Sequence, residues 1–167
     1  IDPTPVPKAR IIRAIAVNEA GVCSEIATAT YFVNQKALEA GYTVSLVADP
    51  DAMFGPQGIY STGEAYDRWY LNGKVGEEPK TNFETRGLEC AGNFELFRGE
   101  RQAYLNQPVG IRIQGGSHRT DSLKRMSVFA REKYSGSEYF DQKIFGDRDT
   151  HSVALRVGFE NAFTYMI

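Results

Sequence analysis

The sequence predicts a mainly β fold, with a minor helical part, in which one antiparallel sheet is preceded by a β-hairpin. Several segments alternate apolar and polar residues or are rich in β-branched and aromatic residues, which is the pattern of strands. Turn signals rich in glycine lie between these segments. We expect the strands of the sheet near 43–48, 93–98, 109–114, 125–131 and 152–157, with few short helices.

The first elements of the chain form a predicted hairpin. Residues 10–17 alternate in part, residues 28–33 are rich in β-formers, and residues 18–21 (Asn-Glu-Ala-Gly) are a turn signal. A lone hairpin is only marginally stable in water, so this one must pack on something else. The segment resembles the last strands of the immunoglobulin-like module at the C-terminal end of chitobiases and related surface enzymes. The resemblance implies a truncated module over 1–33 and a second domain over 34–167.

Signals for short helices flank the first strand of the predicted sheet. Residues 34–41 are expected to form a helical connector that ends at a glycine. After the strand, Asp49 is expected to cap a helix that begins at Pro50 and ends at Gly-Pro. Asp49 and Asp51 are also a tempting metal site, but calcium loops need more oxygen ligands at closer spacing. We therefore interpret the pair as part of a helix cap.

Residues 60–90 are polar and rich in turn signals, so we expect an irregular loop there. Within it, Tyr66, Trp69 and Tyr70 are grouped together. Such aromatic side chains can stack on sugar rings or peptide, but more often they anchor a long loop onto the core. Later in the chain we expect an aromatic-rich loop over 134–145 and the start of a helix over 158–167.

Composition and charge exclude several classes of protein. With 42% hydrophobic and 24% charged residues, the chain of 167 residues is typical of a globular protein. A net charge of −2 gives no basic footprint for nucleic acid or for an anionic membrane. No apolar run approaches the roughly 20 residues that are needed to cross a bilayer. The Pro-rich start, Ile-Asp-Pro-Thr-Pro-Val-Pro, indicates a linker and a piece of a longer protein.

The two cysteines, Cys23 and Cys90, leave their redox state open. They could pair in an oxidising compartment, although two cysteines make no disulfide framework. Two buried free thiols are an equally good interpretation. The spacing of the cysteines matches no zinc site, and His118 and His151 form no metal-ligand pattern.

The most informative run is residues 110–119, Gly-Ile-Arg-Ile-Gln-Gly-Gly-Ser-His-Arg, followed by residues 124–131. Together with the strand at 44–47, the Asp-Pro-Asp after it and the strand at 94–97, this run resembles the N-terminal part of the spore-coat-protein-H (CotH) kinase family. In that family a strand that ends in Arg-Ile-x-Gly-Gly-x-Ser-Arg turns into a second strand that starts with Lys-Ser. The resemblance runs from about residue 42 to residue 157, with its parts in the right order throughout.

By this resemblance, the fold is like the N-terminal lobe of an atypical kinase, and ATP and magnesium are the cofactors of the complete family member. Bare backbone N–H groups in a glycine turn let a phosphate approach without a side-chain clash. A lysine that enters the returning strand can reach the same phosphates, as in protein kinases. The resemblance assigns Gly115, Gly116 and Ser117 to the phosphate-facing turn, Lys124 to the nucleotide lysine, and Arg112 and Arg119 to further phosphate contacts.

Two positions depart from the family's pattern. His118 stands where the family has Ser, and Arg125 stands where a Ser follows the Lys. Taken without the resemblance, Gly-Gly between strands is commonly only a turn, and a lysine on a strand commonly faces solvent. The same residues are therefore also compatible with an ordinary strand connection.

The resemblance also implies what the chain is not expected to do alone. The family's metal-binding and base carboxylates lie in a larger C-terminal lobe, after the last matched strand, so the lobe over 34–167 is expected to be incomplete. Residues 147–151, Asp-Arg-Asp-Thr-His, superficially resemble a kinase catalytic loop but precede that strand, and we interpret them as a solvated turn. We assign no catalytic residue and expect no turnover from this chain alone.

Two functions remain open at this point. The first is a kinase lobe that at most binds nucleotide phosphates, in a protein that phosphorylates another protein at the bacterial cell surface or spore coat. The alternative is a non-catalytic β-rich binding or structural module of a secreted multi-modular bacterial protein, for instance one attached to polysaccharide machinery. Both place the chain outside the cell or on its surface, with no nucleic-acid partner and no membrane span.

Overall fold

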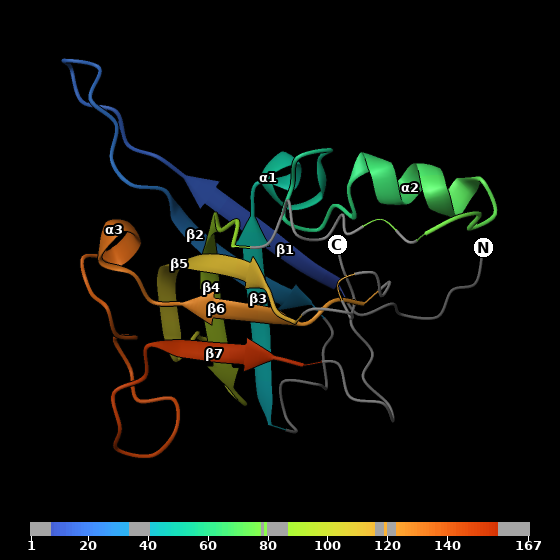
Figure 1. Cartoon of the computed structure of the whole chain (residues 1–167). Helices are drawn as coiled ribbons and strands as arrows, with labels where there is room; N and C mark the ends of the chain where they lie inside the picture. Colours follow the sequence, from blue (N-terminus) through green and yellow to red (C-terminus); the bar gives the residue numbers. More distant parts are fainter. Residues whose placement is uncertain are drawn as a thin grey trace, which may run out of the picture. The chain divides into compact units, whose positions relative to one another are not determined.

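The computed structural model describes residues 8–33, 41–77, 79, 87–115, 119 and 123–156. Figure 1 shows two antiparallel sheets: a two-stranded sheet of β1 and β2, and a five-stranded sheet in the order β3–β4–β5–β6–β7. Of the residues that the structure describes, 38% lie in strands and 14% in helices, so the predicted mainly β fold with a preceding hairpin is confirmed. Neighbouring strands of the larger sheet are also neighbours along the chain, which is the order of a β-meander.

The strands are β1 Lys8–Ala14, β2 Ala27–Val33, β3 Tyr42–Ala48, β4 Cys90–Arg98, β5 Leu105–Ile113, β6 Met126–Phe129 and β7 Ser152–Leu155. The helices are α1 Pro50–Phe54, α2 Glu64–Leu71 and α3 Glu132–Ser135. Every predicted strand has a counterpart, although β4 and β5 begin earlier and β6 is shorter than the sequence indicates. The predicted helices over 34–41 and 158–167 lie outside the described residues, apart from Gly41.

The hairpin of β1 and β2 is closed by the turn that the sequence predicts. The Asn18 side chain shapes the tip, because its Oδ1 accepts hydrogen bonds from the backbone N–H groups of Ala20 and Val22. Gly21 has a φ of 78°, a backbone conformation that residues with a side chain rarely adopt. Local turn chemistry therefore sets the register of the hairpin.

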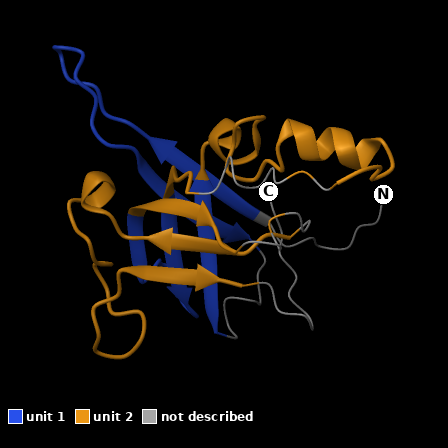
Figure 2. Ribbon diagram, in the orientation of Figure 1, with its two compact units in different colours: residues 1–47, 93–107 blue, residues 48–92, 108–167 orange. Residues whose placement is uncertain are grey.

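The chain forms two compact units, which Figure 2 shows in different colours. The first unit comprises residues 1–47 and 93–107, and the second comprises residues 48–92 and 108–167. The predicted domain boundary after Val33 lies inside the first unit. It stays a prediction, because compactness alone does not show which part of a chain folds by itself.

Side chains of β2 and β4 hold the hairpin in place within the first unit. Glu95 is 2% exposed, and its carboxylate accepts hydrogen bonds from the backbone N–H of Thr30, at 3.0 Å, and from the Thr30 hydroxyl. The rings of Phe32 and Phe97 meet edge to face, with their centroids 5.1 Å apart. The hairpin thus has the packing surface that an isolated pair of strands lacks.

In the second unit, β5 and β6 have one buried face and one polar face. Ile111 and Val128 lie opposite each other in the antiparallel ladder and are fully buried. Successive residues of a strand point to opposite sides, so Gly110, Arg112 and Phe129 lie on the other face. That second face carries one of the side-chain clusters described below.

The helix α1 begins as the sequence predicts. The Asp49 side chain accepts hydrogen bonds from the backbone N–H groups of Asp51 and Ala52, at 3.0 and 2.9 Å, and Pro50 is the first helical residue. The interpretation of Asp49 as a helix cap is therefore confirmed. None of the helices in the described part of the chain is long and apolar enough to cross a membrane.

The expectation of an irregular loop over 60–90 is wrong where α2 forms. Tyr66, Trp69 and Tyr70 are spaced three and four residues apart, which places their side chains on one side of a helix. Glu64 and Arg68, four residues apart, form an ion pair on another side. The grouping of aromatic residues was thus a helical pattern, which turn-forming neighbours obscured.

The two cysteines are both free thiols, so the disulfide alternative is not seen in this structure. Cys23 is exposed and Cys90 is buried. Burial raises the pKa of the Cys90 thiol to about 11. The interpretation of buried free thiols therefore holds for Cys90 alone. Residues 147–149 are exposed, as expected of a solvated turn.

Candidate functional site

The connection between β5 and β6 carries most of the residues assigned to a nucleotide site. After β5 ends, the backbone N–H of Gln114 donates to the carbonyl oxygen of Arg125, 2.8 Å away, and extends the ladder by one step. Gly115 follows with a φ of 103°, and no described atom beyond its chain neighbours lies within 4 Å of the place where a side chain would begin. The predicted site residues Gly116 and Ser117 lie outside the described residues.

Arg119 and Lys124 meet at this connection, and both are almost completely buried, with 5% and 6% exposure. Arg119 Nη1 donates to the carbonyl oxygen of Ile113 at 2.9 Å, and the Lys124 ammonium donates to the carbonyl oxygen of Arg119. Tyr60 contacts the lysine twice. Its hydroxyl accepts a hydrogen bond from the Lys124 backbone N–H at 3.0 Å, and its ring centroid is 5.1 Å from Nζ. The structure thus brings two of the assigned residues into contact, through the ammonium of Lys124 and the backbone carbonyl of Arg119.

Arg112 has a different set of partners, gathered around the carboxylate of Glu89. Its Nε is 2.9 Å from Glu89 Oε2. Arg131 donates to the same oxygen through Nε at 3.2 Å and Nη2 at 2.9 Å. Lys133 Nζ, at 2.9 Å, and the Tyr134 hydroxyl, at 3.2 Å, contact the other oxygen, Oε1. We call these five residues the Glu89 cluster.

Glu89 is the buried member of the cluster. Its side chain is 5% exposed, against 40% for Arg112, 36% for Arg131 and 61% for Lys133. Burial alone would raise the pKa of Glu89, but hydrogen bonds from Lys133 and Arg131 and the charges of Arg131 and Arg112 lower it from 4.5 to about 2. The pKa of Lys133 is raised, first by its hydrogen bond with Tyr134 and then by Glu89. Glu89 is therefore ionised and Lys133 is protonated at neutral pH.

A glycine makes room for the buried carboxylate. A Cβ atom at Gly110 would lie 2.6 Å from Cδ and 2.7 Å from Oε1 of Glu89, which is closer than atoms can pack. Phe129 lies opposite Gly110 in the ladder. Its ring centroid is 4.5 Å from Cζ of Arg131 and 5.5 Å from Cζ of Arg112. The carboxylate thus rests on bare backbone, and both guanidinium groups lie near one aromatic ring.

The sequence pointed to Arg112 but not to its partners. Glu89 precedes Arg112 by 23 positions and Arg131 by 42, so no local spacing could reveal these contacts. The one local sign was Gly110 between Val109 and Ile111, because a glycine inside a strand often marks the close approach of another group. Tyr60, the partner of Lys124, is equally remote in sequence, at 64 positions.

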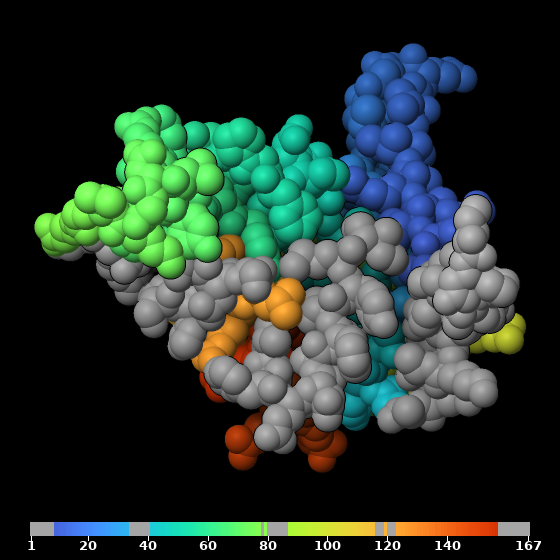
Figure 3. Space-filling view, turned by 90° about the vertical axis from the view of Figure 1, so that its right-hand side faces the viewer, coloured from blue at the N-terminus to red at the C-terminus, as the bar shows by residue number. Residues whose placement is uncertain are grey.

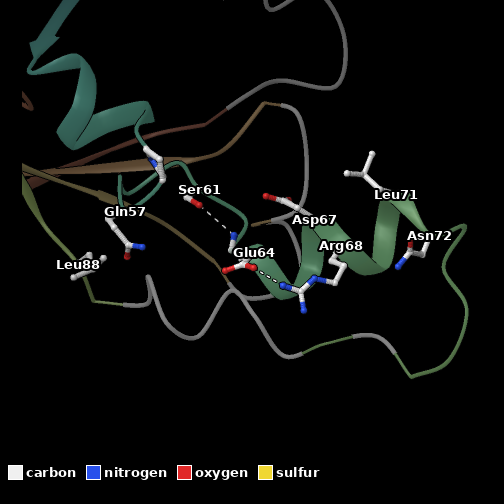
Figure 4. Close-up of a pocket in the computed structure, with 10 residues that line it drawn as sticks. Gln57, Ser61, Glu64, Asp67, Arg68, Leu71, Asn72 and Leu88 are labelled. Carbon is white, nitrogen blue, oxygen red and sulfur yellow. Dashed lines mark hydrogen bonds and ion pairs between the residues drawn. The ribbon is translucent and has the colours of Figure 1, made fainter.

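A pocket of about 580 Å³ lies beside α2, and Figure 4 shows the side chains that line it. The lining residues include Gln57, Ser61, Glu64, Asp67, Arg68 and Leu88. Glu64 pairs with Arg68, and Asp67 accepts a hydrogen bond from the Thr62 hydroxyl, so the charged groups are engaged with their own neighbours. The volume suits a small molecule, but the lining does not define what chemistry it would hold.

The three grouped aromatic residues lie on the opposite side of α2 from this pocket. The ring centroid of Tyr66 is 5.4 Å from that of Trp69 and 6.2 Å from that of Tyr70, and Lys74 Nζ lies 4.7 Å above Tyr70. The helix buries none of its residues, and Tyr70 is 54% exposed. Figure 3 shows α1 and α2, from teal to green, as one continuous surface.

Among the described residues, no group of three or more His, Cys, Asp or Glu side chains is arranged to hold a metal ion. Comparisons of this chain with known protein families, with curated proteins and with solved structures gave no match.

Proposed function

We propose that the connection between β5 and β6 binds the phosphate groups of a nucleotide, ATP with magnesium, as the N-terminal lobe of a CotH-like atypical protein kinase. The observation that carries this proposal is the position of Lys124, whose ammonium lies at the connection beside Arg119 and Tyr60. Gly115, whose φ is positive, belongs to the same connection. A lysine close to glycine-rich backbone is the arrangement with which protein kinases hold nucleotide phosphates.

Two physical features support a phosphate site here. The positive φ of Gly115 and the open space at its Cα let a phosphate approach the backbone N–H groups without a side chain in between. The burial of Lys124 and Arg119 shields their charges from water, and a shielded cation attracts an anion more strongly than an exposed one. Arg112 has the least support among the assigned residues, because Glu89 already engages its guanidinium group.

The wider function follows from the resemblance over residues 42–157. In this proposal the lobe serves a kinase whose substrate is a protein at the bacterial cell surface or in the spore coat. Phosphoryl transfer needs metal-binding and base carboxylates on the far side of the nucleotide, and we propose no catalytic residue in this chain. Nucleotide binding by the chain alone is therefore expected to be weak.

The proposal can be tested by titrating the chain with ATP and magnesium while following NMR chemical shifts. We expect shift changes around Gly115 and Lys124, with a dissociation constant on the order of millimolar. Lys124→Met removes the charge but keeps most of the volume, and it should weaken binding about tenfold or more.

The matched control is Lys143→Met, which removes a cation from an exposed ion pair with Asp149 and should leave nucleotide binding unchanged. Thermal unfolding would establish that both variants are folded. If folded Lys124→Met binds ATP as the original chain does, or if no binding is detected in the original chain at high concentration, the nucleotide proposal fails.

One observation favours a second candidate, a non-catalytic module that binds polysaccharide. The rings of Tyr66, Trp69 and Tyr70 gather on a helix that buries none of its residues, and sugar rings stack on such aromatic surfaces. Trp69 is the single tryptophan of the chain, so its fluorescence reports on this surface directly. A fluorescence change with cell-wall oligosaccharides that Tyr70→Ala abolishes would support this candidate; an unchanged spectrum would remove it.

A further inference from the structure

The Glu89 cluster holds more positive charge than its carboxylate can neutralise. Arg112, Arg131 and Lys133 all form ion pairs with Glu89, so three cations share one anion. Glu132 stands between two of these cations in the sequence but is exposed, and it joins no ion pair within the part of the chain that the structure describes. The cluster therefore carries an excess of two positive charges on the second unit.

Glu89 also uses only part of the hydrogen-bonding capacity around it. A guanidinium group has five N–H donors. Arg112 contacts the carboxylate through Nε alone, and Arg131 through Nε and Nη2. Both Nη groups of Arg112 and Nη1 of Arg131 have no partner within the described residues. Because more than a third of each side chain is exposed, solvent or a ligand can reach these donors.

The two guanidinium groups are held close together. Each donates to the same oxygen, Glu89 Oε2, and each lies near the ring of Phe129. A carboxylate and an aromatic ring thus fix two flexible side chains, which reduces the entropy that a ligand would otherwise have to overcome. Because both groups share one carboxylate oxygen and one ring, their remaining donors belong to one small part of the molecule.

We propose that this region binds a phosphate group in its dianionic form. Two guanidinium groups offer planar pairs of donors that match the oxygens of a phosphate, and a dianion neutralises the two excess charges. Lys133 adds a third cation at the Oε1 side. The neighbouring positions in the sheet are small: Ser127 lies opposite Arg112, and Ser152 lies opposite Phe129, so the face stays open to a tetrahedral group.

In this site Glu89 is a positioning residue rather than a ligand. Its carboxylate repels an anion, but it aligns the arginines whose outer donors bind the phosphate. The site uses neither Lys124 nor Arg119, so it does not depend on the nucleotide proposal. It instead gives Arg112 a role apart from the nucleotide phosphate contact that the resemblance assigns to it.

The first test is a titration with inorganic phosphate at pH 7.5 and low salt, followed by NMR. We expect saturable shift changes at Arg112, Arg131 and Phe129. Arg131→Gln should weaken phosphate binding about tenfold, because it removes a charged bidentate donor. Arg68→Gln removes an arginine from the exposed ion pair on α2 and should leave the affinity unchanged.

A second test separates positioning from net charge. Glu89→Gln makes the surface more positive, so charge alone predicts tighter phosphate binding. Positioning predicts the opposite, an affinity at least about threefold weaker, because the two guanidinium groups are no longer aligned. Tighter binding in Glu89→Gln would overturn the positioning role. Phosphate binding that is absent, or that Arg131→Gln leaves unchanged in a folded protein, would overturn the site.

Two further arms identify the source of the phosphate group. Free phosphate and O-phosphoserine are titrated side by side, with serine as the uncharged control. Tighter binding of O-phosphoserine assigns the site to a phosphorylated organic ligand, and equal or tighter binding of inorganic phosphate assigns it to the free ion. In either case the shift changes at Arg112, Arg131 and Phe129 should follow their own saturation curve. A single curve shared with Gly115 and Lys124 would contradict a separate site.

Discussion

Two glutamates at the same strand are both buried, yet the protein satisfies them in opposite ways. Glu95, inside β4, accepts hydrogen bonds from neutral groups, the backbone N–H and the hydroxyl of Thr30. That hydroxyl is in turn 2.7 Å from the hydroxyl of Ser45. Glu89, immediately before β4, is surrounded by three cations and the Tyr134 hydroxyl.

The difference separates two uses of a buried carboxylate. The donors of Glu95 come from one residue of β2, so this carboxylate ties the hairpin into the first unit, and its burial depends on those donors. The partners of Glu89 more than compensate its charge, and the excess remains on the surface of the second unit. Burial alone therefore does not reveal what a glutamate does, because its partners decide whether it links strands or shapes a charged surface.

The largest effect on stability should come from removing the charge of Glu89. Glu89→Gln places an amide among three cations, and we expect it to lower the free energy of unfolding by about 3 kcal/mol at pH 7. That figure corresponds to the shift in the pKa of Glu89 from 4.5 to about 2. Urea unfolding followed by circular dichroism measures it. Glu132→Gln is the control, with an expected change below about 0.5 kcal/mol; equal changes in the two variants would contradict the cluster's role.

Acid should remove the same contribution gradually. The pKa of Glu89 is lower in the folded protein than in the unfolded chain, so its stabilisation is complete above about pH 4.5 and is lost as the pH falls towards about 2. The difference in unfolding free energy between the original protein and Glu89→Gln should therefore shrink over this range. Urea midpoints at a series of pH values measure it. A difference that stays constant from pH 5 to pH 2 would contradict the lowered pKa.

A smaller loss of stability is expected when the hydrogen bond between Thr30 and Glu95 is removed. Thr30→Val keeps the shape of the side chain and the backbone N–H but removes the hydroxyl from the Glu95 carboxylate, which should cost about 2 kcal/mol. Thr28→Val is a matched control on the same strand. Thr28 is similarly buried, and its hydroxyl has no hydrogen bond within the described residues. If both variants lose the same stability in urea unfolding, the Glu95 contact is not what matters.

The smallest effect should appear at the glycine beneath Glu89. Gly110→Ala introduces a Cβ atom that would lie 2.6 Å from Glu89 Cδ. The carboxylate must then move, which weakens its ion pairs with the three cations. We expect a loss of about 1–2 kcal/mol. In a Glu89→Ala background the same change should cost less, because the clash is gone. A double-mutant cycle measures this coupling, and additive effects would show that the glycine is needed for another reason.

The strands could be predicted from the sequence because their signals are local. The strand signal in residues 93–98 and the turn at Asn18 each depend on neighbours within a few positions, and the strand and the turn are both present in the structure. The helix α2 was missed although its i, i+3 and i+4 aromatic spacing is also local. Polar and turn-forming residues around it outweighed that spacing.

The candidate sites likewise divide into contacts that are local in sequence and contacts that are remote. Arg119 and Lys124 are close in sequence, and their common position could be predicted. The partner of Arg112 could not, because ion pairs over 23 and 42 positions depend on how the strands are brought together. A burial pattern shows that a position is inside, but it does not show which distant side chain will meet it there.

The two free cysteines make it possible to measure how often the start of β4 opens to solvent. Cys23 is exposed and should react with a thiol reagent at once, whereas Cys90 is buried, and burial raises its pKa to about 11. Thiols react as thiolates, so Cys90 must wait until a local fluctuation brings it to water. Glu89 is the residue before Cys90. The ratio of the two labelling rates therefore measures how strongly the Glu89 cluster limits local opening at this end of β4. In a single labelling experiment, Cys23 gives the rate for an exposed thiol and Cys90 gives the rate for the buried one.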